Sequence, residues 1–168
     1  MVPADLNFNH RLFVKEIESQ FSATESQLID ITQRLEGDFE PLGRYFQIGA
    51  DHAKGFAYVG RVNTCRSGGC SGDQNSSNLA SEFFDYFILF DTSGKVLQVR
   101  VFNYQATHGH GISSRGWLRQ FSGFTGNKKL EPGKNIDAIS GATISVRSIT
   151  FDVEEKSRRV RQQLAMVP

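Results

Sequence analysis

The sequence is poor in cysteine, in net charge and in long apolar runs, and each shortage excludes a class of protein. Its 168 residues include two cysteines, and 19 Lys and Arg nearly balance 18 Asp and Glu, for a formal net charge of +1. A chain without a basic excess has no electrostatic footprint for nucleic acid. No apolar run approaches the roughly 20 residues of a membrane-spanning helix. We therefore expect a globular protein with no nucleic-acid partner.

Two recognisable segments are also missing. The first residues, MVPADLNFNHRLF, lack the charged, apolar and small-residue sections of a signal peptide. No glycine-rich dinucleotide fingerprint follows a predicted strand, so the sequence predicts no site for NAD(P)H.

Helical spacing of apolar residues is found at both ends of the chain. Phe8, Phe13 and Phe21 share a face in the predicted first helix. A capping box at Thr24 opens a predicted second helix, which ends near Gly37. A long closing helix is predicted over 143–164.

Between these helices, apolar and β-branched runs predict strands. The runs RYFQIG and KGFAYVGRVNTC are two of them, with Gly60 as a candidate bulge. Two more flank the turn Asp91–Gly94 as a hairpin, and its second strand alternates Val96, Gln98, Arg100 with Leu97, Val99, Val101. The polar stretch 66–78 predicts a loop, and Ser113 or Ser114 is the expected cap of a short helix with Trp117.

These patterns predict an α+β fold: a mostly antiparallel sheet with N-terminal helices and a long C-terminal helix. We expect a single domain over 1–168. It would have an N-terminal helical part (1–53) and a core (54–165) that carries the function.

The stretch NIDAISGATISV, residues 135–146, places small and polar residues before the closing helix. Ser140 could cap a helix whose first turn holds Ala142 and Thr143. Gly141 would let the backbone approach a ligand, and the N–H groups of a helix start favour phosphate. Plain capping and a phosphate site are both compatible with this stretch alone.

The same residues resemble a known motif. DAISGATIS is similar to the flavinylation motif Asp-x-x-Ser/Thr-Gly-Ala-Thr of the FMN-binding domain family, which includes flavin-carrying subunits of Rnf and Na⁺-pumping NADH:quinone oxidoreductase complexes. Asp137 matches the acid, Ser140, Gly141 and Ala142 match the small residues, and Thr143 matches the flavin acceptor. The hairpin and the THGHG loop also follow the family's order of elements, so the resemblance covers roughly 54–164.

The resemblance implies a covalent cofactor. In this family a separate flavin transferase, using FAD and Mg²⁺, joins FMN through its phosphate to the threonine hydroxyl and releases AMP. Thr143 would then be the substrate of another enzyme, because a free hydroxyl is a poor nucleophile without an external base. In a preparation made without the transferase, FMN would be absent.

One loop departs from the family pattern. Where relatives often have Thr-Pro-Gly, this chain has Thr107, His108 and Gly109. The resemblance places this loop beside the flavin, and an imidazole there could tune the reduction potential. His108 and His110 lie two apart, but no third ligand is evident, so we predict no metal site.

The resemblance favours an electron carrier over a complete enzyme. Electrons would come from a redox partner such as a membrane electron-transfer complex, since no nicotinamide site is predicted. A covalent tether suits an extracytoplasmic, membrane-associated protein, so we expect a leader or anchor that this sequence does not include. A flavin-dependent reductase with its own small substrate, and a non-redox module for a phosphate ligand, remain alternatives.

We predict that Cys65 and Cys70 form a disulfide in the native compartment, since they are the only cysteines and close a short loop. Two thiols are too few for zinc without other ligands, and the spacing differs from Cys-x-x-Cys, although a redox-active pair remains an alternative. So small a loop should stabilise the fold by less than the roughly 3 kcal/mol expected for 15 residues. Thiol labelling should find no free thiol. Two free thiols would contradict the pairing, and Cys→Ser variants that lose electron transfer at unchanged stability would indicate the redox role.

Overall fold

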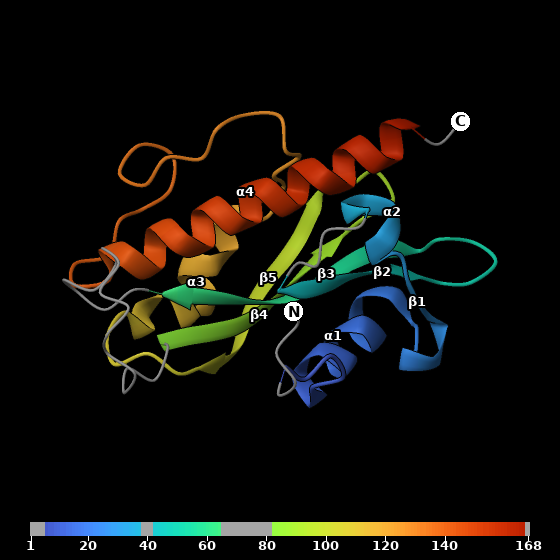
Figure 1. Cartoon of the computed structure of the whole chain (residues 1–168), viewed down its shortest axis with the longest axis horizontal. Coiled ribbons are helices and arrows are strands. Elements are labelled where there is room, and N and C mark those ends of the chain that lie inside the picture. The colour runs from blue at the N-terminus through green and yellow to red at the C-terminus, as the bar shows by residue number, and fades with distance from the viewer. Residues whose placement is uncertain (1–5, 38–41, 65–81, 167–168) are drawn as a thin grey trace.

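The structure, a computed structural model, describes residues 6–37, 42–64 and 82–166 (Figure 1). Cys65, Cys70 and the predicted loop 66–78 lie outside the described residues. The helices are α1 (Arg11–Phe21), α2 (Thr32–Glu36), α3 (Arg115–Leu118) and α4 (Thr143–Met166), with 3₁₀ turns η1 (Glu25–Gln27), η2 (His110–Ser113) and η3 (Arg119–Phe121). None of the described helices combines the length and apolar character needed to cross a membrane.

Five strands form one sheet in the order β1-β2-β3-β4-β5, and every neighbouring pair is antiparallel. The strands are β1 (Leu28–Asp30), β2 (Gly43–Ile48), β3 (Gly55–Thr64), β4 (Glu82–Phe90) and β5 (Val96–Tyr104). The predicted α+β class and antiparallel sheet are therefore confirmed. The first 53 residues supply β1 and β2 as well as helices, so they complete the sheet.

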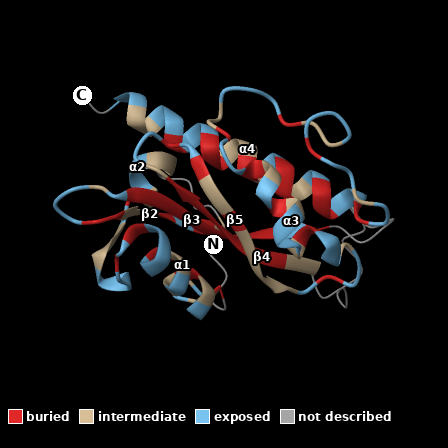
Figure 2. Ribbon diagram, turned by 180° about the vertical axis from the view of Figure 1, so that it is seen from behind, coloured by how far each residue is buried: buried red, intermediate tan, exposed pale blue. Residues whose placement is uncertain are grey.

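The sheet is covered on both faces (Figures 1 and 2). Phe13, Ile17 and Phe21 of α1 pack against Phe87 and Leu89 on one face. The other face packs against α4 and α3, and its buried cluster includes Tyr58, Tyr86, Val146, Ile149, Val153 and Phe121. Strands that are buried on both faces explain the nearly continuous apolar run of β4, FFDYFILF.

The β4–β5 hairpin has the predicted turn. Asp91 Oδ1 accepts hydrogen bonds from Ser93 N (2.8 Å), Ser93 Oγ (2.6 Å) and Lys95 N (3.0 Å), and Gly94 takes φ +84°. Partial burial opposes ionisation of Asp91, but these bonds outweigh it and lower the pKa of the carboxyl. These bonds fix the conformation of the turn that joins β4 to β5.

The segment predicted as one helix from Thr24 to Gly37 is divided. The capping box of Thr24 and Gln27 exists, but it caps the single 3₁₀ turn η1, and β1 follows. The chain pairs β1 with β2 before it forms α2, which ends at Gly37 as predicted. Edge pairing to an existing sheet therefore overrides helical spacing in this short segment.

The bulges also differ from the prediction. Gly60 pairs regularly with Gly43 and Tyr86, and a Cβ there would collide with the Tyr58 ring, which explains the glycine. The register shifts lie in the β4–β5 pairing, where Leu97 and Phe102 are the extra residues. Strict alternation in β5 was therefore wrong, because each bulge turns an apolar side chain toward the α1 face.

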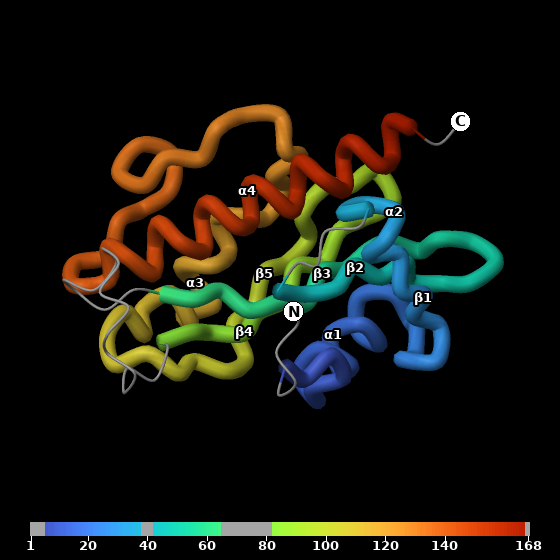
Figure 3. Tube along the Cα trace, in the orientation of Figure 1, coloured from blue at the N-terminus to red at the C-terminus, as the bar shows by residue number. Residues whose placement is uncertain are grey.

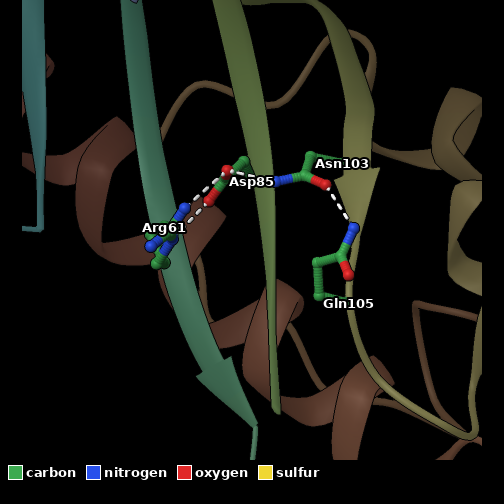
Figure 4. Close-up of polar contacts among 4 residues, drawn as sticks. All are labelled: Arg61, Asp85, Asn103 and Gln105. Carbon is green, nitrogen blue, oxygen red and sulfur yellow. Dashed lines mark hydrogen bonds and ion pairs between the residues drawn. The ribbon is translucent and has the colours of Figure 1, made fainter. Parts of the chain in front are cut away.

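A buried ion pair joins β3 to β4 near one end of the sheet (Figure 4). Arg61 donates from Nε to Asp85 Oδ1 (2.7 Å) and from Nη2 to Oδ2 (2.9 Å), and both side chains are almost fully buried. Asn103 Nδ2 also donates to Asp85 Oδ2 (2.8 Å), and Gln105 Nε2 donates to Asn103 Oδ1 (2.7 Å). The network ties three adjacent strands together.

Asp85→Asn should lower the free energy of unfolding by about 3 to 5 kcal/mol, because it removes the buried carboxylate that accepts two hydrogen bonds from the Arg61 guanidinium. Urea unfolding measures the loss. Lys134→Ala is the control: its ion pair with Glu131 is mostly exposed, so the expected change is within about 1 kcal/mol. Equal effects of the two substitutions would show that the buried pair contributes no more than an exposed one.

Candidate functional site

A cavity of about 250 Å³ lies at the end of the sheet where β3 ends and β4 begins. Figure 3 shows that the chain after β5 and the start of α4 reach this same end. Four segments contribute, and the lining residues are Thr64, Glu82, His108, Gly109, Gly141, Ala142, Thr143, Ile144 and Ser145. The cavity therefore brings together His108, Gly109 and the Gly-Ala-Thr stretch, which are far apart in sequence.

A turn immediately before α4 shapes the part of the cavity that residues 141–145 line. Ala142 N donates to Ile139 O (3.1 Å), and the helical ladder begins with Val146 N donating to Ala142 O (2.9 Å). Gly141 takes φ +78°, a conformation that side chains disfavour. A Cβ on Gly141 would meet nothing within 4 Å, so the space over its backbone is open.

The structure corrects the expected cap. The helix starts at Thr143, so Ala142 and not Ser140 occupies the position directly before it. Ser140 lies in the preceding turn with an exposed side chain. The physical reason is the left-handed conformation of Gly141, which is not helical, so the helix starts two residues later than a Ser140 cap requires.

The first turn of α4 offers the cavity backbone N–H donors that no described residue pairs. The N–H groups of Thr143, Ile144 and Ser145 precede the first helical hydrogen bond, and the positive end of the helix dipole lies there. All three residues line the cavity, and Thr143 is exposed. This wall suits a phosphoryl group.

Tyr104 connects the loop with His108 and Gly109 to α4. Its hydroxyl donates to His108 O, so Ser145 Oγ, 2.8 Å away, must be the donor to Tyr104 Oη. Burial raises the pKa of Tyr104, which keeps the phenol protonated as this bond needs. Gly109 has φ +88°, and a Cβ there would lie 2.6 Å from Ser145 Oγ and 2.7 Å from Tyr104 Oη. The loop with His108 is therefore held directly against α4.

Asp137 and Thr107 are not among the residues that line the cavity. The Asp137 side chain is exposed, while its backbone is held by bonds from Trp117 Nε1 to Asp137 O (2.8 Å) and from Asp137 N to Gln120 Oε1 (2.8 Å). Thr107 Oγ1 donates to Glu82 Oε1 (2.6 Å). Thr107 thus positions a carboxylate that lines the cavity.

Thr64 is a lining residue that the sequence did not reveal. It is 8% exposed, and its Oγ1 has no hydrogen-bond partner among the described residues. A buried hydroxyl without a partner is costly, so a ligand in the cavity would supply the missing bond. Thr64 reaches the site only through its pairing with Glu82 across β3 and β4, a register that no local pattern predicts.

The cavity can hold a small anion or phosphate ester, because helix donors, a glycine turn and a buried hydroxyl converge on it. Within the described ranges, no three His, Cys, Asp or Glu side chains gather to hold a metal ion. The fold and this cavity thus define an α+β domain with a cavity at a helix start that is suited to a phosphoryl group.

Comparison with known families finds a match over part of the chain. Residues 82–155 match the FMN-binding domain, the same family that the motif around Thr143 resembles. The match runs from β4 into α4 and includes all the lining residues except Thr64. No curated protein matches the chain at a significant level.

Gly109→Ala should weaken binding of free FMN to the apoprotein about tenfold or more, because its Cβ displaces either Tyr104 or Ser145 from the cavity wall. Gly133→Ala is a matched control: Gly133 has φ +86°, but a Cβ there meets nothing within 4 Å. Both substitutions should cost about 1 kcal/mol of stability for the backbone conformation alone. Flavin fluorescence titration measures the affinity, and equal affinities for the two variants would show that the loop does not shape the FMN site.

Proposed function

We propose that this domain carries FMN as a covalent electron-transfer group, attached through the FMN phosphate to Thr143. The family match supports FMN binding, and the position of Thr143 supports the attachment. Its side chain is exposed at the edge of the cavity, in the first turn of α4. FMN, when bound, supplies transfer of one or two electrons.

The residues around Thr143 fit a phosphodiester. The open space over Gly141 leaves room for a phosphoryl group beside the backbone. The N–H groups of Ile144 and Ser145 can donate to its oxygens, and the helix dipole stabilises the charge that remains after esterification. Arg147, exposed one turn further along α4, adds positive charge at the same end of the helix.

The other lining residues offer polar groups to the flavin ring. Thr64 Oγ1 offers a buried hydroxyl, and the His108–Gly109 backbone forms the wall opposite α4. His108 is exposed at this wall. An imidazole beside the bound flavin would supply charge or a hydrogen bond that tunes its reduction potential.

Thr143 needs a separate enzyme to become modified. No hydrogen bond from a described side chain reaches its hydroxyl, so no base within the described residues activates it. In the proposed reaction, Thr143 Oγ forms a bond to the flavin-side phosphorus of FAD. The bond from that phosphorus to the bridging oxygen breaks, AMP leaves, and the hydroxyl proton passes to a base of the transferase.

The proposed partners follow from this chemistry. A flavin transferase that uses FAD and Mg²⁺ would act on Thr143, and a redox partner would exchange electrons with the flavin. A covalent tether prevents loss of the cofactor where FMN cannot be replenished. We therefore extend the proposal to an extracytoplasmic protein associated with a membrane electron-transfer complex.

Thr143→Ala should abolish covalent flavin after co-expression with a flavin transferase, because it removes the only proposed acceptor oxygen. Intact mass and in-gel flavin fluorescence measure the attachment. Thr92→Ala, an exposed threonine in the hairpin turn, should keep full flavinylation. Covalent flavin on Thr143→Ala would overturn this attachment site, and a wild type that binds FMN only reversibly would overturn the covalent linkage.

A further inference from the structure

A second cavity, of about 190 Å³, lies along the edge strand β5, between α1 and α3. Its polar lining is dominated by three arginines, Arg100, Arg115 and Arg119, with Gln20 and Gln98 beside them. It shares no lining residue with the cavity at the start of α4.

Arg100 is largely buried but uses little of its hydrogen-bonding capacity. Its side chain is 14% exposed, and its one ion pair runs from Nη1 to Glu16 Oε1 (3.3 Å). A guanidinium has five N–H donors, and within the described part of the chain no other acceptor takes them. Burial, followed by the nearby Arg115 charge, lowers the pKa of Arg100. The site thus holds a costly, under-bonded cation.

The two other arginines increase the positive charge. Arg115 and Arg119 are four residues apart, so their like charges face each other across one helical turn and repel. Neither forms an ion pair with a described residue. Glu16 balances the charge of Arg100 only. Arg115 and Arg119 therefore give the lining about two positive charges that no described residue compensates.

Gln98 gives the site a complementary acceptor. Its Oε1 is buried and has no hydrogen-bond partner among the described residues. A ligand that satisfies both Gln98 and the arginines must accept several hydrogen bonds and donate at least one. Hydrogen phosphate and a partly protonated polycarboxylate have this combination of groups.

From this convergence we infer that the cavity along β5 binds a small oxyanion, a phosphate or carboxylate group, through Arg100, Arg115 and Arg119. Planar guanidinium groups match the oxygens of such anions in pairs. The site is separate from the FMN cavity and does not depend on flavin attachment.

Calorimetric titration of the full chain with sodium phosphate, and separately with citrate, tests the site at constant ionic strength set by sodium chloride. Wild type should show saturable binding of at least one of these anions. The double substitution Arg115→Gln/Arg119→Gln should weaken that binding at least tenfold. The control Arg34→Gln/Arg161→Gln removes the same charge from two exposed arginines elsewhere and should leave the affinity unchanged.

Two results would overturn the inference. One is the absence of saturable binding of either anion to wild type. The other is equal affinity in wild type and the Arg115→Gln/Arg119→Gln variant, which would place any bound phosphate elsewhere, such as the start of α4. The circular dichroism spectrum and unfolding midpoint of each variant confirm that it is folded.

Discussion

The position of α4 on the sheet is the constraint on which the site depends. Two tyrosines of adjacent strands hold it: Tyr86 Oη donates to Asp152, and Ser145 Oγ donates to Tyr104 Oη. Asp152 and Ser145 are seven residues apart, two turns along the same face of the helix. These two bonds fix both the rotation of α4 and its shift along its axis, so the N-terminus of α4 meets the end of β3.

The contact between α4 and the sheet contains buried charge as well as apolar side chains. Burial raises the pKa of Asp152, which opposes ionisation, while Lys156 Nζ lies 3.4 Å from its Oδ1 and 5.4 Å from the centre of the Tyr58 ring. Such a pair is costly to desolvate and adds little net stability. It does penalise any shift of α4, because a shift would leave a buried charge without its partner.

The segment outside the family match is part of the same structural unit. The strands β1, β2 and β3 extend the sheet on the β4 side, and α1 covers the face that α4 leaves open. The buried Arg61–Asp85 pair crosses the boundary of the match, as does the pairing of Thr64 with Glu82. The cavity at the start of α4 therefore uses residues from both sides of that boundary.

Local patterns in the sequence determined the elements with strong, continuous signals. The Asp91–Gly94 turn, the Ser114 cap of α3 and the long α4 are set by nearby residues, so they were predictable. The motif around Thr143 also predicted the family, because it is contiguous. Only the tertiary structure decided the rest: Thr24–Gly37 was divided when β1 paired with the sheet edge, and the bulges fell in β5 rather than at Gly60. Thr64, Glu82 and Tyr104 joined the site through strand register and packing, which depend on contacts between residues far apart in the chain.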